Sequence, residues 1–253
     1  MSVKSAERVL LIFELLANNT EGLTIKEISE KLTIPQSSTS NLVRTLLQAG
    51  YLTQDSLKRY QLGPKLIQIG TVAMDSLDIS SQGRPYLKKL MEEVEETVFM
   101  AVLSGKELVY VAKIDSDRSI RTTAQPGYRK PLYCTGLGKT FLAFLPEPDR
   151  KALLDEIKLT PITPKTITDR ETLETQLETF AEQGYAVDDE ENEEGLFCLA
   201  APIFGADHKI QAAISVAGPR ERMLHRKEQI IEKLSQTALI ISKNIGYSHA
   251  LHK

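Results

Sequence analysis

Cysteine, histidine and long uncharged runs are scarce in this sequence. The 253 residues include two cysteines and four histidines, and no stretch without a charged side chain exceeds 12 residues. Two thiols are too few for a disulfide scaffold, and a reducing compartment would keep them free. A membrane-spanning helix needs about 18 apolar residues, so the sequence argues against a protein that spans the membrane.

An export signal is missing as well. The apolar run from Val9 to Leu16 is interrupted by Glu14, and no small-residue cleavage site follows it, which does not fit a signal peptide. We therefore expect a cytoplasmic protein without a membrane partner. The composition, 42% hydrophobic and 26% charged, is typical of an ordered chain that builds cores. At this length we expect two domains.

The acidic excess is not spread evenly along the chain. The formal net charge is −3, but residues 1–74 carry eight basic and six acidic side chains. That segment therefore has a net charge of +2, which leaves −5 for residues 75–253. The asymmetry favours the amino-terminal part as the partner of a polyanion.

Residues 24–50 have the spacing of a helix-turn-helix. The segment from Thr24 to Glu27 has the form of a capping box, which predicts a helix over 24–32. Pro35 suits the first turn of a second helix, which runs to about Ala49 and stops at Gly50. Two short helices joined by a three-residue turn are typical of DNA-binding proteins.

The second of these helices has one apolar and one polar face. Leu42, Val43, Leu46 and Leu47 share one arc and are expected to face the core. Side chains near the start of a recognition helix usually enter the major groove, and an arginine one turn further on suits a phosphate. A solvated helix face is the alternative. The predicted base-reading residues are Gln36, Ser37, Ser38 and Asn41, and the predicted phosphate ligand is Arg44.

A wing is expected directly after this helix. Two short strands, Tyr51–Leu52 and 60–63, are joined by 53–59, where Asp55-Ser56 favours a turn. We predict that Lys58 and Arg59 at its tip reach the flanking DNA backbone or the minor groove. A merely solubilising hairpin is the alternative.

The first helix, Val3 to Asn18, is apolar over more than half of its circumference. One face is expected in the domain core. The other face either meets a second subunit or is buried within the same domain, and the sequence leaves both possibilities open.

Beyond a linker around 65–80, the pattern alternates between strands and helices. Strands followed by helices, then an antiparallel pair and a last helix, predict an α+β sandwich with a sheet against helices. The expected helices are 81–96, 136–145, 147–157, 169–182 and 221–247, and the expected strands are 97–104, 106–114, 120–125, 197–204 and 210–217.

Three separated segments carry a family resemblance. The first runs through LTIKEISEKL (23–32), QSST (36–39), LLQAGYL (46–52) and YQLG (60–63). The second is PLYCTGLGKTFLA (131–143), and the third is GYAVDDEE (184–191) leading to GLFCLAAPI (195–203). With these segments the sequence resembles the IclR family of regulators from Val3 to about Tyr247.

The resemblance implies a DNA-binding transcriptional regulator, with repression favoured over activation. It implies a winged helix-turn-helix in 1–64, a linker helix in 65–80 and a GAF-like α/β sandwich effector domain in 81–253. Members of this family bind palindromic double-stranded operators as dimers or tetramers. A small organic or aromatic acid would be the effector. The resemblance implies neither catalytic residues nor a cofactor or metal.

The resemblance also implies a set of effector-binding residues. The start of a helix near Gly136 offers free N–H groups and a positive dipole end, which independently favours a carboxylate. Polar side chains in the third expected strand favour a hydroxylated or carboxylated ligand. The alternatives to a binding role are that Asp188 belongs to a solvated acidic loop and that Cys198 is an inert, small hydrophobic side chain. The implied pocket residues are Ser119, Thr122, Gly136, Leu137, Asp188 and Cys198.

Two rival classes of protein remain as alternatives. One is an enzyme or small-molecule-binding protein built on the GAF-like domain without operator binding, and the other is an interaction module that has lost DNA binding. The run Gly136–Thr140 ends like a phosphate loop, but Tyr133 stands where that loop needs its first glycine. The sequence leaves the effector, the operator and the choice between dimer and tetramer open.

Overall fold

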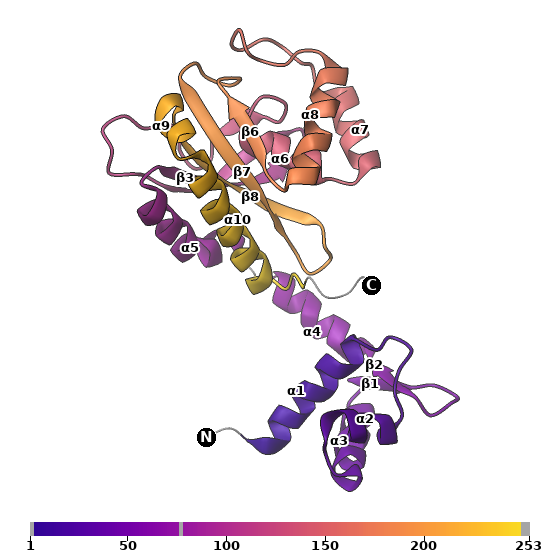
Figure 1. Cartoon of the computed structure of the whole chain (residues 1–253). Helices are drawn as coiled ribbons and strands as arrows, with labels where there is room; N and C mark the ends of the chain where they lie inside the picture. The colour runs from indigo at the N-terminus through magenta and orange to yellow at the C-terminus, as the bar shows by residue number, and fades with distance from the viewer. Residues whose placement is uncertain (1–2, 76–77, 249–253) are drawn as a thin grey trace. The chain divides into compact units, whose positions relative to one another are not determined.

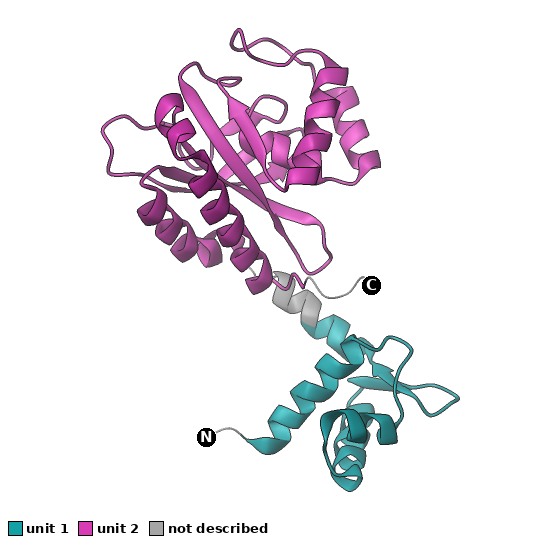
Figure 2. Ribbon diagram, viewed as in Figure 1, with its two compact units in different colours: residues 1–77, 250–253 teal, residues 78–249 magenta. Residues whose placement is uncertain are grey.

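A computed structural model describes residues 3–75 and 78–248. The chain divides into two compact units, the first formed by the described residues up to 75 and the second by those from 78 onward (Figure 2). Within these described ranges no helix has the length and apolar character needed to cross a membrane.

The first unit is a winged helix-turn-helix. The predicted helices over 24–32 and 35–49 and the predicted wing are confirmed. Ile12, Ile28, Val43 and Leu52, from four different elements, are buried together in its core. Its elements are α1 (Lys4–Ala17), α2 (Ile25–Leu32), α3 (Gln36–Gln48), β1 (Leu52–Gln54), β2 (Tyr60–Leu62) and α4 (Pro64–Asp75) (Figure 1).

Local sequence explains where α2 begins and ends. The Thr24 hydroxyl accepts a hydrogen bond from Glu27 N at 3.3 Å, and Glu27 Oε2 accepts one from Thr24 N at 2.7 Å. This reciprocal pair is the capping box that the sequence predicts. The helix ends at Thr33, which has a left-handed φ of 54°, and α3 begins after Pro35.

The second unit is a six-stranded antiparallel sheet with helices on both faces. The strand order is β5-β4-β3-β8-β7-β6. Along β3, Phe99 and Ala101 join the core cluster on the α6 side, whereas Met100 lies beside Gly83 of α5. The elements are α5 (Ile79–Val94), β3 (Thr97–Ser104), β4 (Glu107–Ile114), β5 (Arg129–Pro131), α6 (Gly136–Phe144), α7 (Glu147–Glu156), α8 (Arg170–Gln183), β6 (Ala186–Asp189), β7 (Leu196–Phe204), β8 (Ile210–Pro219), α9 (Arg220–His225) and α10 (Lys227–Asn244).

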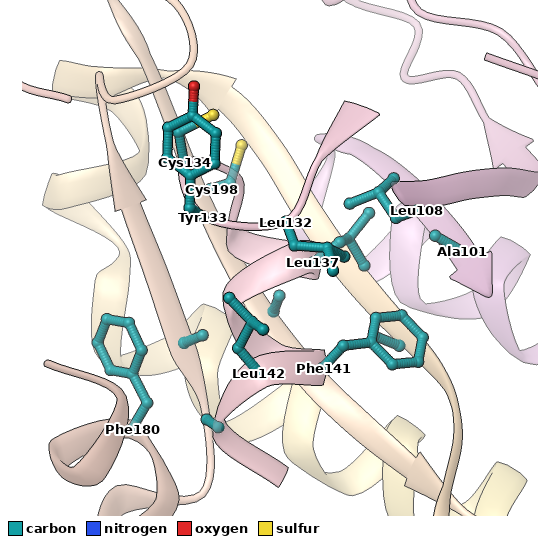
Figure 3. Packing of buried hydrophobic residues seen from close by; sticks show 14 of the residues in the cluster. Ala101, Leu108, Leu132, Tyr133, Cys134, Leu137, Phe141, Leu142, Phe180 and Cys198 are labelled. Carbon is teal, nitrogen blue, oxygen red and sulfur yellow. The ribbon is translucent and has the colours of Figure 1, made fainter. Parts of the chain in front are cut away.

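Helix α6 is the most deeply buried helix on its side of the sheet. Every residue from Gly136 to Ala143 is buried, with Leu137, Phe141 and Leu142 in the core that the sheet and α8 complete (Figure 3). The helix packs so closely on the preceding segment that a Cβ at Gly138 would lie 2.4 Å from the Leu132 Cα. Glycine is therefore required at position 138 for close backbone approach.

The expected strand over 120–125 is wrong. Residues 115–128, which we call the strap, have no regular secondary structure. Side chains satisfy carbonyls of the strap: Lys113 Nζ donates to Thr122 O at 3.1 Å, and Arg222 Nη2 donates to Ile120 O at 3.2 Å. Residues 120–125 are therefore held by side chains and do not form the strand that their β-branched residues predict.

Two shorter differences concern the end of the sheet and the last helix. The sequence prediction omits β5 and β6, which have three and four residues. The expected helix over 221–247 is broken at Arg226, whose φ is −117°. The Arg226 guanidinium donates to Val94 O at 2.9 Å and to Glu93 O at 3.4 Å. These bonds satisfy carbonyls at the end of α5.

Candidate functional site

The polar face of α3 is presented to solvent as the sequence predicts. Gln36, Ser37, Asn41 and Arg44 are exposed, and Ser38 is half-buried. The opposite face is anchored by buried Val43 and Leu46. Thr39 is fully buried, and its hydroxyl donates to the carbonyl of Pro35 at 3.3 Å. The helix therefore offers uncharged donors and acceptors at its start and one cation a turn later.

The wing is a tight hairpin with one exposed cation at its tip. Asp55 Oδ1 accepts hydrogen bonds from Leu57 N at 2.9 Å and Arg59 N at 2.8 Å, so the turn is held from within. Lys58 is exposed at a left-handed φ of 60°. The Arg59 side chain turns back to the body, where it donates to Gly22 O at 2.8 Å. The structure therefore presents Lys58, and not Arg59, at the tip.

In the second unit a cavity of about 110 Å³ lies between the start of α6, the sheet and the strap. Its floor is the sheet face: Asp188 of β6 stands opposite Cys198 of β7, which stands opposite Ala217 of β8. Directly opposed side chains on neighbouring strands lie close together. With a volume of about 110 Å³, the cavity has room for a small molecule of a few heavy atoms or a single ring.

Five of the six predicted effector residues line this cavity. Thr122 comes from the strap, Gly136 and Leu137 from α6, and Asp188 and Cys198 from the sheet. Ser119 is exposed and does not line the cavity. Ser119 and Thr122 are three residues apart, a spacing that would place their side chains on opposite faces even of a regular strand.

The sequence prediction missed several lining residues. Phe99 and Tyr110 form a stacked pair with ring centroids 4.9 Å apart, and Lys130 and Asn192 lie within 3.4 Å of each other through Nζ and Oδ1. The alternation of β3 and β4 could have placed the two aromatic rings. Lys130 could not be found, because the edge strand that carries it is too short to predict. The missed residues are Phe99, Tyr110, Thr123, Ala124, Tyr128, Lys130, Thr135, Asn192, Glu193, Leu196, Ser215 and Ala217.

Groups of positive character line part of the cavity. Thr135 caps α6 by accepting a hydrogen bond from Gly138 N at 3.0 Å. Among the residues that the structure describes, no acceptor is found for the N–H groups of Gly136 and Leu137, which are orphan donors at a helix start. The Lys130 ammonium adds a full positive charge to the cavity wall. An anion is therefore favoured there.

Asp188 is the most perturbed acid of the cavity. It is 1% exposed, and its Oδ1 accepts hydrogen bonds from Glu191 N at 2.8 Å and Asn192 N at 3.4 Å. Burial raises the pKa of Asp188 to about 7, while the positive charge of Lys139 opposes that rise. This carboxyl group therefore changes charge near neutral pH.

The pKa values of the two thiols are shifted in the direction opposite to that of a nucleophilic cysteine. Burial raises the pKa of Cys134 to about 12, and burial likewise raises the pKa of Cys198 well above its ordinary value. Nucleophilic cysteines need a lowered pKa. Neither thiol therefore has the lowered pKa of a nucleophilic cysteine. Among the described residues, no group of three or more His, Cys, Asp or Glu is arranged to hold a metal.

Comparison with known proteins covers both units. Residues 5–56 match the family described as IclR helix-turn-helix domain. Residues 71–243 match the family described as bacterial transcriptional regulator IclR C-terminal. The second match alone covers more than half of the chain.

Curated relatives match over nearly their full length. The chain is 33% identical to the HTH-type transcriptional regulator XynR of Escherichia coli over 247 residues, which are 97% of this chain and 98% of that protein. It is 32% identical to the HTH-type transcriptional repressor AllR of Escherichia coli, over 96% of this chain and 90% of that protein.

Solved structures share the fold over the whole chain. The crystal structure of Pseudomonas aeruginosa HmgR aligns with a TM-score of 0.84 at 27% identity, covering 98% of this chain and 100% of that one. The crystal structure of the Agobacterium tumefaciens repressor BlcR aligns with a TM-score of 0.82 at 25% identity, covering 98% and 99%.

Proposed function

Because the chain belongs to the IclR family and is an HTH-type transcriptional regulator, we propose that it represses transcription in the cytoplasm and releases or retains its operator according to a small carboxylate bound in the cavity. The single observation that carries the effector class is that the start of α6 and Lys130 both line this cavity. Both favour a negative charge on the ligand.

Size and polarity narrow the effector further. A cavity of about 110 Å³ suits a small ligand. Thr122, Asp188 and Ser215 offer hydroxyl and carboxyl groups, and the Phe99–Tyr110 pair offers a ring face. These groups favour a small hydroxy or keto acid, or an aromatic acid with one ring. Asp188 would contact a hydroxyl or carbonyl group of the ligand.

We assign operator reading to the start of α3. Gln36, Ser37, Ser38 and Asn41 are the proposed base-reading residues, because uncharged donors and acceptors at a helix start suit the edges of bases in the major groove. Arg44 and Lys58 would bind phosphates. Arg59 would act mainly by holding the wing, because its guanidinium is engaged with Gly22.

We further propose that the operator-binding form is a dimer or a dimer of dimers. Val3, the N-cap of α1, and Leu10 and Leu11 of the helix are exposed. Leu10 and Leu11 follow Val3 by seven and eight residues, so at about 100° per residue the three side chains fall within an arc of about 100°. Burial of this face against a second copy would remove apolar surface from water. A twofold symmetric pair would then match a palindromic operator.

Thermal unfolding of the full chain with a panel of hydroxy, keto and aromatic carboxylates tests the effector proposal. A ligand present at about a hundred times its Kd adds about 2.7 kcal/mol to the free energy of unfolding, which raises Tm by several degrees. A carboxylate that raises Tm should also change the mobility shift of operator DNA. Lys130→Met should weaken the affinity for that carboxylate about tenfold. The matched control, Lys106→Met, removes a cation that pairs with Glu156 outside the cavity.

Two outcomes would contradict the proposal. If neutral analogues such as amides shift Tm as much as the acids, the carboxylate class is wrong. If Lys130→Met and Lys106→Met both bind the ligand with the affinity of the wild type, the Lys130 charge has no role in binding.

A further inference from the structure

Lys139 is a fully buried cation on the helix that begins at the cavity. It is 0% exposed and pairs with Glu191, which is 5% exposed. Its Nζ also donates to Gln176 Oε1 at 3.0 Å and lies 5.2 Å from the centre of the Phe180 ring. One ammonium therefore joins α6, α8 and the turn between β6 and β7.

Stability alone gives this pair little reason to exist. Removing two charges from water is expensive, and replacement of a buried ion pair by apolar side chains is often neutral or stabilising. Here the pair is not even fully satisfied, because Glu191 Oε2 is buried and has no hydrogen-bond partner among the described residues. The pair is better explained by a role in fixing the local arrangement of the chain.

The turn held by Glu191 is one that shapes the cavity. Residues 190–195 link β6 to β7, and Asn192 and Glu193 line the cavity. The N–H groups of Glu191 and Asn192 hold Asp188 Oδ1. Lys139 follows Gly136 by three residues, about one helical turn. The ion pair therefore ties the α6 wall to the turn that orients Asp188.

A second set of contacts holds the same turn from outside. Thr163 Oγ1 donates to Glu190 O and Thr166 Oγ1 donates to Glu191 O, each at 2.6 Å. The carbonyl groups of the turn are thus fixed independently of the Lys139 charge. Loss of the ion pair should therefore loosen the inner amides more than the outer carbonyls.

We propose that Lys139 and Glu191 are positioning residues of the effector pocket, whose buried ion pair holds the β6–β7 turn so that Asp188 faces the ligand. The pair does not touch the ligand. It fixes the two amides that orient Asp188, and it sets the electrostatic surroundings of that carboxyl. The inference rests on the proposed function, in which an effector occupies this cavity.

The test replaces the pair by apolar side chains in the full chain. Lys139→Met with Glu191→Leu avoids leaving one buried charge alone, so the double variant should fold with a Tm within a few degrees of the wild type. The matched control is Lys151→Met with Glu147→Leu, an exposed ion pair on α7. Hydrogen exchange of the Glu191 and Asn192 amides should become at least about tenfold faster in the first variant only.

A second readout follows the Asp188 carboxyl itself, by carbon NMR during a pH titration. Removing the Lys139 cation should raise the midpoint, because this cation stabilises the charged form more than Glu191 destabilises it. Loss of the hydrogen bonds from the Glu191 and Asn192 amides would raise the midpoint too, because these bonds also lower the pKa of Asp188, so the titration reports the cation and the turn together. The other groups that face or line the same space are Tyr110, Cys134, Cys198, Lys130 and Glu193, and both variants keep them.

Unchanged amide exchange together with an unchanged midpoint would overturn the proposal and leave the pair as a structural feature. Neither readout needs an effector. Titration with lactate and with 4-hydroxybenzoate then separates the two ideas. If the wild type binds both probes no better than acetamide, the carboxylate effector is wrong while the exchange and titration results still decide the positioning role.

Discussion

Asp188 illustrates how the surroundings of a single side chain decide its chemistry. The same acidic run, residues 188–194, contains solvated carboxylates such as Glu194 and one carboxyl at 1% exposure. Its neighbour Asp189 keeps a lowered pKa because Arg220 donates to it, at 2.6 Å from Nε to Oδ1. Adjacent residues thus face opposite sides of β6, one toward the cavity and one toward an ion pair.

We predict that Asp188 makes the protein less stable as the pH rises through neutrality. Folded Asp188 keeps its proton up to about pH 7, whereas the unfolded chain loses it near 3.8. The unfolded state therefore binds fewer protons between these values, and stability falls as pH rises. A shift of this size corresponds to at most about 4 kcal/mol between pH 4 and pH 8.

Urea unfolding of the wild type and Asp188→Asn at pH 5, 6, 7 and 8 measures this effect. Asparagine keeps the Oδ1 acceptor for Glu191 N and carries no charge. The wild type should lose stability relative to the variant from pH 5 to about pH 7, with little further loss to pH 8. Parallel curves across this range would mean that Asp188 ionises like an exposed carboxyl group.

Residues of the site differ in how far the sequence could predict them. Gly136, Leu137 and Asp188 lie in segments whose residues carry the family resemblance, so their place in the cavity was predictable. Lys139 lies in the same segment, yet its role depends on Glu191, 52 residues away. No local pattern predicts which lysine is buried by a distant partner. Ser119 is exposed on the strap and does not line the cavity.

At the scale of elements, α3 carries one side chain suited to a base edge and another suited to a phosphate. Asn41 and Arg44 are both exposed and stand one turn apart on one face. The amide of Asn41 suits the two-point recognition of a base edge, whereas the guanidinium of Arg44 suits a phosphate. The order of the two along the helix therefore matters, because the start of a recognition helix lies deepest in the groove.

We predict that Arg44→Ala weakens operator binding to all sequences and lowers the salt dependence by about one phosphate contact. Asn41→Ala should instead change the preferred base at one position, by about 1–3 kcal/mol of discrimination. Selection of binding sites from random DNA at two salt concentrations measures both. Lys106→Ala, in the second unit, is the control. Equal changes in both α3 variants would reject this division of roles.

The elements themselves were predicted well where the local signal was strong. The capping box of α2, Pro35 before α3 and the continuous apolar patterns of β3, β7 and β8 all led to the correct element type. β5 and β6 were missed because three or four residues carry too little periodicity. The strap and the break at Arg226 depend on hydrogen bonds from distant side chains, which no window along the sequence contains.

At the scale of the whole molecule, the two units divide the charge as well as the work. The described part of the first unit belongs to a segment with a net charge of +2, and the rest of the chain carries −5. A modest positive charge suits a partner that carries a dense negative charge.

We predict that Leu10→Glu with Leu11→Glu converts a dimer into monomers. The two side chains are 60% and 43% exposed in one copy, and charges placed there would repel those of a second copy. Analytical ultracentrifugation should show the mass fall to that of one chain, and operator affinity should drop at least about a hundredfold because two linked half-sites are lost. Ile162→Glu, at a similarly exposed position of the second unit, is the control. If the double variant is still a dimer, its interface lies elsewhere. If operator affinity falls while the measured mass is unchanged, α1 acts by orienting α3 within one copy.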